Sequence, residues 1–546
     1  MTHAVLSVAS EFFPVVKTGG LADVAAALPA ALAGEDFAVT TLLPGYPAVM
    51  AALRDRAELY YFAKLAEGPA RLWRGRIGPR DVAVLEADHL FARTGGPYQD
   101  VTGRDWPDNW RRFAALAWVG CELACGRAGA YAADLVQAHD WQAALTPAYL
   151  HYAGGPPSVM TLHNLAFQGQ FAPEVFPLLG LPPAAWSVEG VEYYGGVGYL
   201  KAGILFADAV TTVSPTYAAE IRTEAGGMGL GGLLRGRGRR LMGILNGLDT
   251  GVWNPATDSL LAHTYTARNR THPHMGRAAC KAALQERMGL EPDPEALLFG
   301  VVSRLSWQKG LDLLLGALPV LLESGAQLAL VGSGDAALRD GFLAAAAAHP
   351  GRVGCFIGYD EKLAHAMMGG ADAVLVPSRF EPCGLTQLSA LRYGALPVVA
   401  RVGGLADTVI DANEMALSAG AGTGVMFSPP DQTMLETALA RTAALWADRK
   451  QWTRLQGNAM RTDVSWKHPA ARYAALFREL IADRTTAGST PVGSTPVGST
   501  TAGSTPVGST TASSTTAGST TAGSTIAGGT IAGDTIAGGT TGGEAA

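Results

Sequence analysis

Short apolar segments, each followed by a polar or glycine-bearing loop and a helical stretch, recur along most of the chain. The first is residues 4–9, which precede the loop at 17–20 and the helical stretch at 21–32. Further apolar segments that we expect to be strands occupy residues 135–138, 158–161 and 209–213. Buried strands that alternate with helices imply parallel sheets with helices on both faces.

The pattern restarts after residues 247–255. The next predicted strands are residues 297–302, 327–331, 353–357, 373–376 and 396–400, with a Leu-rich helix at 310–324. The sequence therefore predicts an α/β protein of two doubly wound domains, residues 1–250 and 251–484. Ligands of such folds bind outside the carboxyl ends of the strands, so two facing domains create a cleft. We expect the last helix of the second domain to pack back on the first.

Residues 485–546 have a different character. They repeat near five-residue units such as P-V-G-S-T and T-A-G-S-T, and they contain no aromatic residue, Lys or Arg. Such a segment buries too little apolar surface to offset chain entropy, which predicts a flexible tail. A stacked repeat structure is disfavoured because the repeat unit has no bulky core residue.

Composition narrows the class of protein further. The 546 residues carry a formal net charge of −6, and no basic excess or polybasic run favours nucleic acid or an anionic membrane surface. The five cysteines form no C-x-x-C pair, which disfavours a zinc site or a disulfide framework. The first residues do not resemble a signal peptide, and no apolar run approaches the ~20 residues that span a bilayer. We therefore expect a cytoplasmic protein.

Three loops carry candidate chemistry. In the first, Gly19 and Gly20 let the backbone approach a ligand, while Lys17 supplies a positive charge and Asp23 an acceptor for sugar hydroxyls. Taken alone, this loop is equally consistent with a tight turn and a surface lysine.

The other two loops follow predicted strands of the second domain. Arg304 and Lys309 place two cations on one strand-end loop, which suits a diphosphate, although charged loop residues are usually solvated. Glu381 stands beside Gly384 at the start of a helix, whose amino end can bind phosphate. A carboxylate favoured there by the helix dipole is the simpler alternative.

His139 and His163 each follow a predicted strand, on the side where the cleft is expected. A lone histidine at a strand end is more often structural than catalytic, and this spacing fits no zinc-protease motif. The chain also contains no D-x-D, the carboxylate pair that commonly holds Mg²⁺ on a nucleotide sugar. Lys and Arg would then neutralise a leaving diphosphate, so we expect neither a metal nor another cofactor.

Together these motifs resemble the bacterial glycogen synthases and plant starch synthases. The matching segments are K-T-G-G-L-A-D-V at 17–24, H-D-W at 139–141, T-L-H-N at 161–164, N-G-L-D at 246–249, W-N-P at 253–255, S-R-L-S-W-Q-K-G at 303–310 and R-F-E-P-C-G-L-T-Q at 379–387. These segments occur in the same order as in that family, and the resemblance covers residues 1 to about 480. The resemblance implies the GT-B fold and a glycosyltransferase that needs no metal. It also implies transfer of glucose from ADP-glucose, with UDP-glucose as a competitor, to the non-reducing end of glycogen or another α-1,4-glucan with retention of configuration.

The resemblance also implies roles for individual residues. On the donor side it assigns phosphate contacts to Lys17, Gly19, Gly20, Gly384, Leu385 and Thr386, a donor-side position to Asp23, a sugar contact to Asn246 and nucleobase stacking to Tyr359. As catalytic residues it implies Glu381, Lys309, Arg304 and His163. On the acceptor side it implies Tyr98, His139 and Asp140.

One position separates this chain from broader GT-B relatives, which carry a second Glu eight residues after the first. Here that position is Ser389, as the resemblance to glycogen synthases predicts. Ser389 therefore argues against a sucrose-synthase-like or trehalose-type transferase. A catalytically silent glucan-binding scaffold is disfavoured because it needs no diphosphate site. A phosphorylase is disfavoured because no pyridoxal-phosphate lysine signature stands out.

Overall fold

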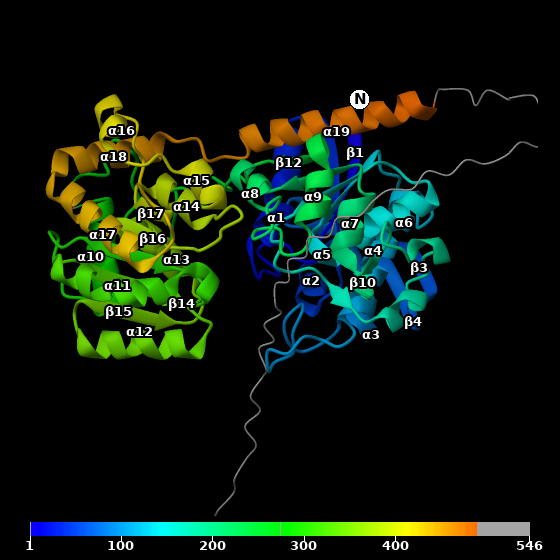
Figure 1. Cartoon of the computed structure of the whole chain (residues 1–546), viewed down its shortest axis with the longest axis horizontal. Coiled ribbons are helices and arrows are strands. Elements are labelled where there is room, and N and C mark those ends of the chain that lie inside the picture. Colours follow the sequence, from blue (N-terminus) through cyan, green and yellow to red (C-terminus); the bar gives the residue numbers. More distant parts are fainter. Residues whose placement is uncertain (1, 273–274, 489–546) are drawn as a thin grey trace, which may run out of the picture. The chain divides into compact units, whose positions relative to one another are not determined.

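The computed structural model describes residues 2–272 and 275–488 (Figure 1). The segment predicted as a flexible tail begins at residue 485, whereas the last described helix extends to Gly488; the rest of the segment lies outside the described residues. Two large sheets organise the described part, one of nine strands and one of six. We call the parts built on them the first lobe and the second lobe. Among the described residues, no helix is both long enough and apolar enough to cross a membrane.

The nine-stranded sheet of the first lobe has the order β12-β11-β7-β6-β1-β2-β5-β4-β3. Its strands are β1 (His3–Val8), β2 (Phe37–Pro44), β3 (Arg54–Leu65), β4 (Gly68–Ile77), β5 (Arg80–Glu86), β6 (Leu135–His139), β7 (Ser158–Leu162), β11 (Ala209–Thr212) and β12 (Leu241–Gly243). The pairings from β12 through β5 are parallel. Chain order reverses between β1 and β6, and the loops after these two strands therefore meet at one edge of the sheet.

The antiparallel strands β3 and β4 differ from the all-parallel sheets that the sequence predicts. Leu65 pairs with Gly68, so only Ala66 and Glu67 form the turn. Both have positive φ, 49° and 77°, as a two-residue hairpin turn requires. The usual sequence signal for that turn is Asn-Gly or Asp-Gly, and its absence explains why the hairpin was not predicted. A small sheet of β8 (Gln170–Phe171), β9 (Glu192–Tyr193) and β10 (Gly196–Gly198) was not predicted either.

The six-stranded sheet of the second lobe is parallel throughout, with the order β15-β14-β13-β16-β17-β18. Its strands are β13 (Leu298–Val302), β14 (Gln327–Gly332), β15 (Val353–Ile357), β16 (Ala373–Val376), β17 (Leu396–Ala400) and β18 (Val425–Phe427). In chain order this is 3-2-1-4-5-6, the doubly wound arrangement. Its reversal lies between β13 and β16, the strands that precede the loops with Lys309 and Glu381.

Helices cover these sheets, as the alternating pattern predicts. In the first lobe they are α1 (Gly20–Ala33), α2 (Pro47–Ala52), α3 (Asp88–Phe91), α4 (Asn109–Ala124), α5 (Asp140–Ala143), α6 (Leu145–Ala153), α7 (Tyr199–Phe206), α8 (Pro215–Glu220) and α9 (Gly231–Gly236). In the second lobe they are α10 (Arg277–Arg287), α11 (Leu311–Glu323), α12 (Ala336–Ala348), α13 (Glu361–Gly370), α14 (Thr386–Tyr393), α15 (Gly403–Thr408), α16 (Glu414–Ala419), α17 (Gln432–Ala447) and α18 (Arg449–Arg461).

The last helix, α19 (Lys467–Gly488), contacts the first lobe. The segment just before this helix passes residue 248, whose N–H donates to the carbonyl of Val464 at 2.7 Å. Tyr473 and Phe477 are fully buried among apolar residues of α1 and the first sheet, and the Phe477 ring meets that of Phe37 edge-on, with the centroids 5.6 Å apart. The predicted domain limits at residues 250 and 484 stay predictions.

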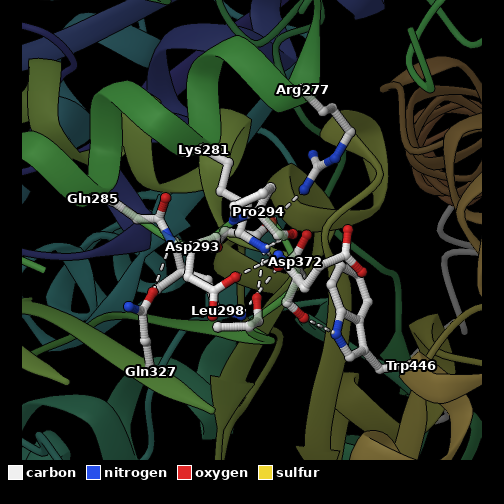
Figure 2. A network of polar contacts seen from close by, with 12 residues as sticks. Arg277, Lys281, Gln285, Asp293, Pro294, Leu298, Gln327, Asp372 and Trp446 are labelled. Carbon is white, nitrogen blue, oxygen red and sulfur yellow. Dashed lines mark hydrogen bonds and ion pairs between the residues drawn. The ribbon is translucent and has the colours of Figure 1, made fainter. Parts of the chain in front are cut away.

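A buried polar network fastens α10 to the second sheet (Figure 2). Lys281 on α10 pairs with Asp372 at 2.8 Å, and its ammonium also donates to the carbonyls of Pro294 and Ala296. Asp372 in turn accepts the N–H of Leu298 at the start of β13. Each member of this ion pair is therefore satisfied by fixed partners, which limits the cost of burying the two charges.

Candidate active site

At the reversal point of the second sheet, the structure brings Lys309 and Glu381 together. Their Nζ and Oε2 atoms are 2.6 Å apart, and the hydroxyl of Ser378 donates to the same carboxylate oxygen at 2.9 Å. Lys309 closes a short 3₁₀ turn whose next residue, Gly310, has φ 65°. A Cβ at Gly310 would lie 2.0 Å from the carbonyl oxygen of Pro377, so glycine is needed for the two loops to approach.

The ammonium of Lys309 has donors to spare. A lysine ammonium carries three N–H donors, and among the described residues only Glu381 accepts one from Lys309. The side chains are 18% and 8% exposed, so both charges are largely shielded from solvent. A partly buried ammonium with unused donors is suited to an anionic ligand.

Gly384 and the start of α14 continue this loop. Gly384 has φ 74°, and Gln387 fixes the turn because its amide donates to the carbonyls of Cys383 and Gly384. Leu385 and Thr386 follow at the amino end of α14. This end of a helix favours an anion because its first N–H groups lack partners within the helix.

The structure does not bring Arg304 into this cluster. Its side chain is exposed, and it forms no ion pair among the described residues. Lys309 and Arg304 lie on one loop, as predicted, but only Lys309 contacts Glu381.

In the first lobe, the loop after β1 is organised by Glu11, a residue that sequence reasoning missed. Its carboxylate is 4% exposed and accepts the N–H of Thr18 at 2.6 Å, the Thr18 hydroxyl at 2.5 Å and the Tyr98 hydroxyl at 2.6 Å. Glu11 therefore holds the glycine loop in place and ties it to Tyr98. Its position just after a buried strand, at the reversal point of the sheet, is the signal that could have identified it.

Lys17 and Asp23 form an ion pair at 3.0 Å across the glycine loop. Burial raises the pKa of Asp23, although the neighbouring Lys17 acts in the opposite direction. The second carboxylate oxygen of Asp23 is buried without a hydrogen-bond partner. It is therefore an available acceptor beside the loop, consistent with the predicted donor-side role.

His139 and His163 lie side by side, at the ends of the paired strands β6 and β7. Nδ1 of His139 is 2.9 Å from Nε2 of His163, and Nε2 of His139 is 3.1 Å from the Ser7 hydroxyl. Burial lowers the pKa of His139 to about 3 and that of His163 well below its ordinary value. Both rings are therefore neutral near pH 7, and His139 fixes the orientation of His163.

Asp140 is buried at the same place, with φ 52°. One carboxylate oxygen accepts the N–H of His163 at 2.6 Å and that of Asn164 at 3.4 Å. Burial raises the pKa of Asp140 to about 7. In the described structure Asp140 and His139 thus contact the segment that carries His163.

A pocket is lined by residues of both lobes and of the connecting segment at 247–253. Of the predicted donor residues, the pocket is lined by Lys17, Asp23, Tyr359, Leu385 and Thr386. The Tyr359 side chain is 67% exposed at this pocket. Asn246 lies outside the lining and is buried, with its side-chain oxygen unpartnered.

Metal-binding residues do not gather in the described ranges 2–272 and 275–488, which contain no group of three or more His, Cys, Asp or Glu side chains placed to hold an ion. All five cysteines are free thiols in the structure.

Comparisons with known proteins agree with this geometry. The family model described as the starch synthase catalytic domain matches residues 4–236, and that of the glycosyl transferases group 1 matches residues 285–455. A glycogen synthase of Rhodopseudomonas palustris is 60% identical over 485 residues, which cover 88% of this chain and 100% of that protein. The chain belongs to the glycogen and starch synthase family. A glycogen synthase of Methylocella silvestris is 58% identical over 88% of this chain and 99% of its own length.

Solved structures confirm the fold expected for a member of this family. The catalytic domain of starch synthase IV from Arabidopsis thaliana, bound to ADP and acarbose, matches with a TM-score of 0.80 and 30% identity. The match covers 88% of this chain and 100% of that one. A sucrose-phosphate synthase of Thermosynechococcus elongatus, 17% identical with a TM-score of 0.55, shares the fold alone. The predicted GT-B fold, family and glycosyltransferase class are thus confirmed.

Proposed function

We propose that this glycosyltransferase moves glucose from ADP-glucose to the non-reducing end of an α-1,4-glucan, with retention of configuration. The observation that carries the proposal is the pairing of Lys309 with Glu381 at the reversal point of the second sheet. A cation with N–H donors that have no acceptor among the described residues lies there beside a carboxylate, and α14 starts five residues after Glu381. A nucleoside diphosphate sugar needs these partners, a cationic diphosphate site and an oxygen acceptor for the sugar.

In the proposed donor site, different predicted residues contact the diphosphate, the nucleobase and the sugar. Lys309, Lys17 and the backbone of Gly384, Leu385 and Thr386 contact the diphosphate, and Gly19 and Gly20 allow its close approach. We extend the diphosphate site to Arg304 as well, because it lies exposed on the same loop as Lys309. Tyr359 stacks on the nucleobase, while Asn246, Asp23 and His163 face the sugar. The ADP present in the structure of starch synthase IV supports adenine as the base.

The reaction breaks the bond between C1 of glucose and the β-phosphate oxygen, and the electron pair leaves with ADP. The acceptor 4-hydroxyl attacks C1 on the same face, and its proton passes to the departing phosphate oxygen. Lys309 stabilises the charge that develops on this phosphate; one such preorganised donor is typically worth a few kcal/mol. Glu381 holds the sugar and the positive charge that develops at C1. No metal takes part.

The acceptor side belongs to the first lobe. Tyr98, held by Glu11 and Ser10, contacts the glucan. His139 and Asp140 act on the acceptor side by fixing the segment of His163, since both ring nitrogens of His139 and one carboxylate oxygen of Asp140 contact Ser7, His163 and Asn164. The net charge of −6 and the free thiols support an enzyme that works in the cytoplasm, without nucleic acid or membrane partners.

Transfer of labelled glucose to glycogen tests the proposal, with ADP-glucose and UDP-glucose compared in EDTA. We expect EDTA-resistant transfer from ADP-glucose. A preference for UDP-glucose would contradict the assigned donor and retain the reaction. Glucan binding without transfer from either donor would contradict the enzyme and favour a scaffold.

A further inference from the structure

Two carboxylates of the donor pocket, those of Asp249 and Glu361, have no part in the proposed reaction. The pocket is lined by three acidic residues, Asp23, Asp249 and Glu361. Asp23 is paired with Lys17, and Asp249 accepts the N–H of Gly251 at 2.9 Å. Glu361 begins α13, just after the strand β15, and reaches the pocket beside Tyr359.

The carboxylate of Glu361 contacts the imidazole of His365, which lies one helical turn further along α13. Nε2 of His365 lies 3.7 Å from Oε1 of Glu361, while its Nδ1 lies 2.7 Å from Oδ2 of Asp258. The imidazole stacks on Trp253 with the centroids 3.9 Å apart and the planes 10° from parallel. Asp258 is itself fixed by the hydroxyl of Tyr393, which donates to it at 2.6 Å.

This arrangement keeps Glu361 in one place and ionised. Contact with His365 lowers the pKa of Glu361, although its partial burial acts in the opposite direction. Burial lowers the pKa of His365, but the contacts with Glu361 and Asp258 outweigh it and raise the pKa overall. An ionised carboxylate only accepts hydrogen bonds, so its natural ligands are hydroxyl and N–H groups.

The neighbouring residue indicates which hydroxyls these are. The Tyr359 hydroxyl donates to Oε2 of Glu361, so the carboxylate lies next to the ring proposed to stack on the nucleobase. In a nucleotide the ribose adjoins the base. In other doubly wound folds, an acidic residue near the end of a strand accepts the ribose hydroxyl.

We propose that Glu361 accepts the ribose hydroxyls of the donor nucleotide and that His365 is the positioning residue that holds it there. The inference rests on the proposed function, because it requires a nucleotide donor. It assigns to this site a preference for ribonucleotides over deoxyribonucleotides. Tyr359 gives up its contact with Glu361 when it stacks on the base, and the ribose hydroxyls replace that contact.

Calorimetric titration of the full chain with ADP and with 2′,3′-dideoxy-ADP tests the assignment. We expect the unsubstituted protein to bind ADP at least about tenfold more tightly than dideoxy-ADP, since a hydrogen bond to a charged group is stronger than one between neutral groups. Glu361→Ala should bring the two affinities within about threefold, and Glu361→Gln should give an intermediate ratio. The matched control is Glu414→Gln at the exposed start of α16, which should leave the ratio unchanged.

A second variant addresses His365. His365→Gln should reduce the ratio of the two affinities while the affinity for dideoxy-ADP stays within about twofold. Equal losses for both nucleotides would overturn the positioning role. If the unsubstituted protein bound both nucleotides equally while still transferring glucose, the role of Glu361 would be overturned and the proposed function would stand. Failure to bind ADP at all would contradict both.

Discussion

Among the described residues of the second lobe, two lysine–carboxylate ion pairs of similar length differ in burial and in the partners of the lysine. Lys281 and Asp372 are 2.8 Å apart, and Lys309 and Glu381 are 2.6 Å apart. The ammonium of Lys281 donates to two carbonyls and forms an ion pair with Asp372, so three fixed acceptor atoms surround it. Lys309 has one acceptor among the described residues, at the end of the sheet where ligands bind. We infer that the first ion pair stabilises the fold, and we propose that the second binds the donor.

The largest effect should come from the satisfied pair. Lys281→Ala leaves the buried carboxylate of Asp372 without its cation, and such a loss typically costs about 3–5 kcal/mol of stability. We expect the denaturant midpoint of unfolding to fall accordingly. Lys450→Ala, an exposed lysine of the same lobe, serves as control and should change the midpoint little. A Lys281 variant as stable as this control would remove the distinction between the pairs.

Lys309→Ala should reduce turnover strongly and stability only slightly. We expect turnover with ADP-glucose and glycogen to fall by about 10²–10³-fold, the typical effect of removing one preorganised donor. The unfolding midpoint should change much less than in Lys281→Ala, because Glu381 keeps the hydroxyl of Ser378 and its side chain faces the ligand site. Near-normal turnover in the Lys309 variant would exclude this lysine from the reaction.

Unlike these charged lysines, the buried histidines of the first lobe are neutral, and this makes the stability of the protein depend on pH. A native pKa of about 3 for His139, against about 6.5 when unfolded, means that the unfolded chain binds the extra proton first. Stability is therefore complete above pH 6.5 and is lost as pH falls toward 3. At pH 4.5, two pH units below 6.5, the loss from His139 alone is roughly 2–3 kcal/mol.

Denaturant titrations of the unsubstituted protein and His139→Gln at pH 7 and pH 4.5 measure this loss. The variant should be less stable at pH 7 but should lose less on acidification. Equal losses in the two proteins would show that His139 is not held neutral by burial.

The smallest effect should come from Tyr98→Phe. The change removes the hydroxyl that donates to Glu11, while the ring keeps its contacts with Phe113 and Trp141. We expect the KM for glycogen to rise several-fold and the KM for ADP-glucose to stay within about twofold. Equal increases in both constants would contradict the acceptor-side position of Tyr98.

Much of this site could be predicted from the sequence because its motifs follow buried strands. Lys309 and Glu381 were identified separately, and the apolar pattern correctly placed each after a strand. That they touch depends on β13 and β16 being neighbours, which a pattern of single strands does not reveal. Arg304 was predicted with the same weight as Lys309, since residue type alone does not show which cation faces the carboxylate.

The missed residues share a physical cause. Glu11 lies outside the glycine motif, and its importance comes from contacts with Tyr98, 87 positions away. Asp372 is an ordinary acidic residue until the fold places Lys281 beside it. The hairpin of β3 and β4 turns at Ala66 and Glu67. Both have positive φ, but neither residue type is typical of such a turn. Tertiary contacts, rather than local preference, decide all three.

We propose that the N–H donors of Lys309 that have no acceptor among the described residues bind the β-phosphate of the donor. The most direct test is the ratio of the affinities for ADP and AMP, measured calorimetrically in the unsubstituted protein and in Lys309→Ala. We predict that the unsubstituted protein binds ADP much more tightly than AMP, and that the variant loses at least about tenfold of this ratio while its affinity for AMP changes little. An unchanged ratio in a folded Lys309 variant would contradict the account.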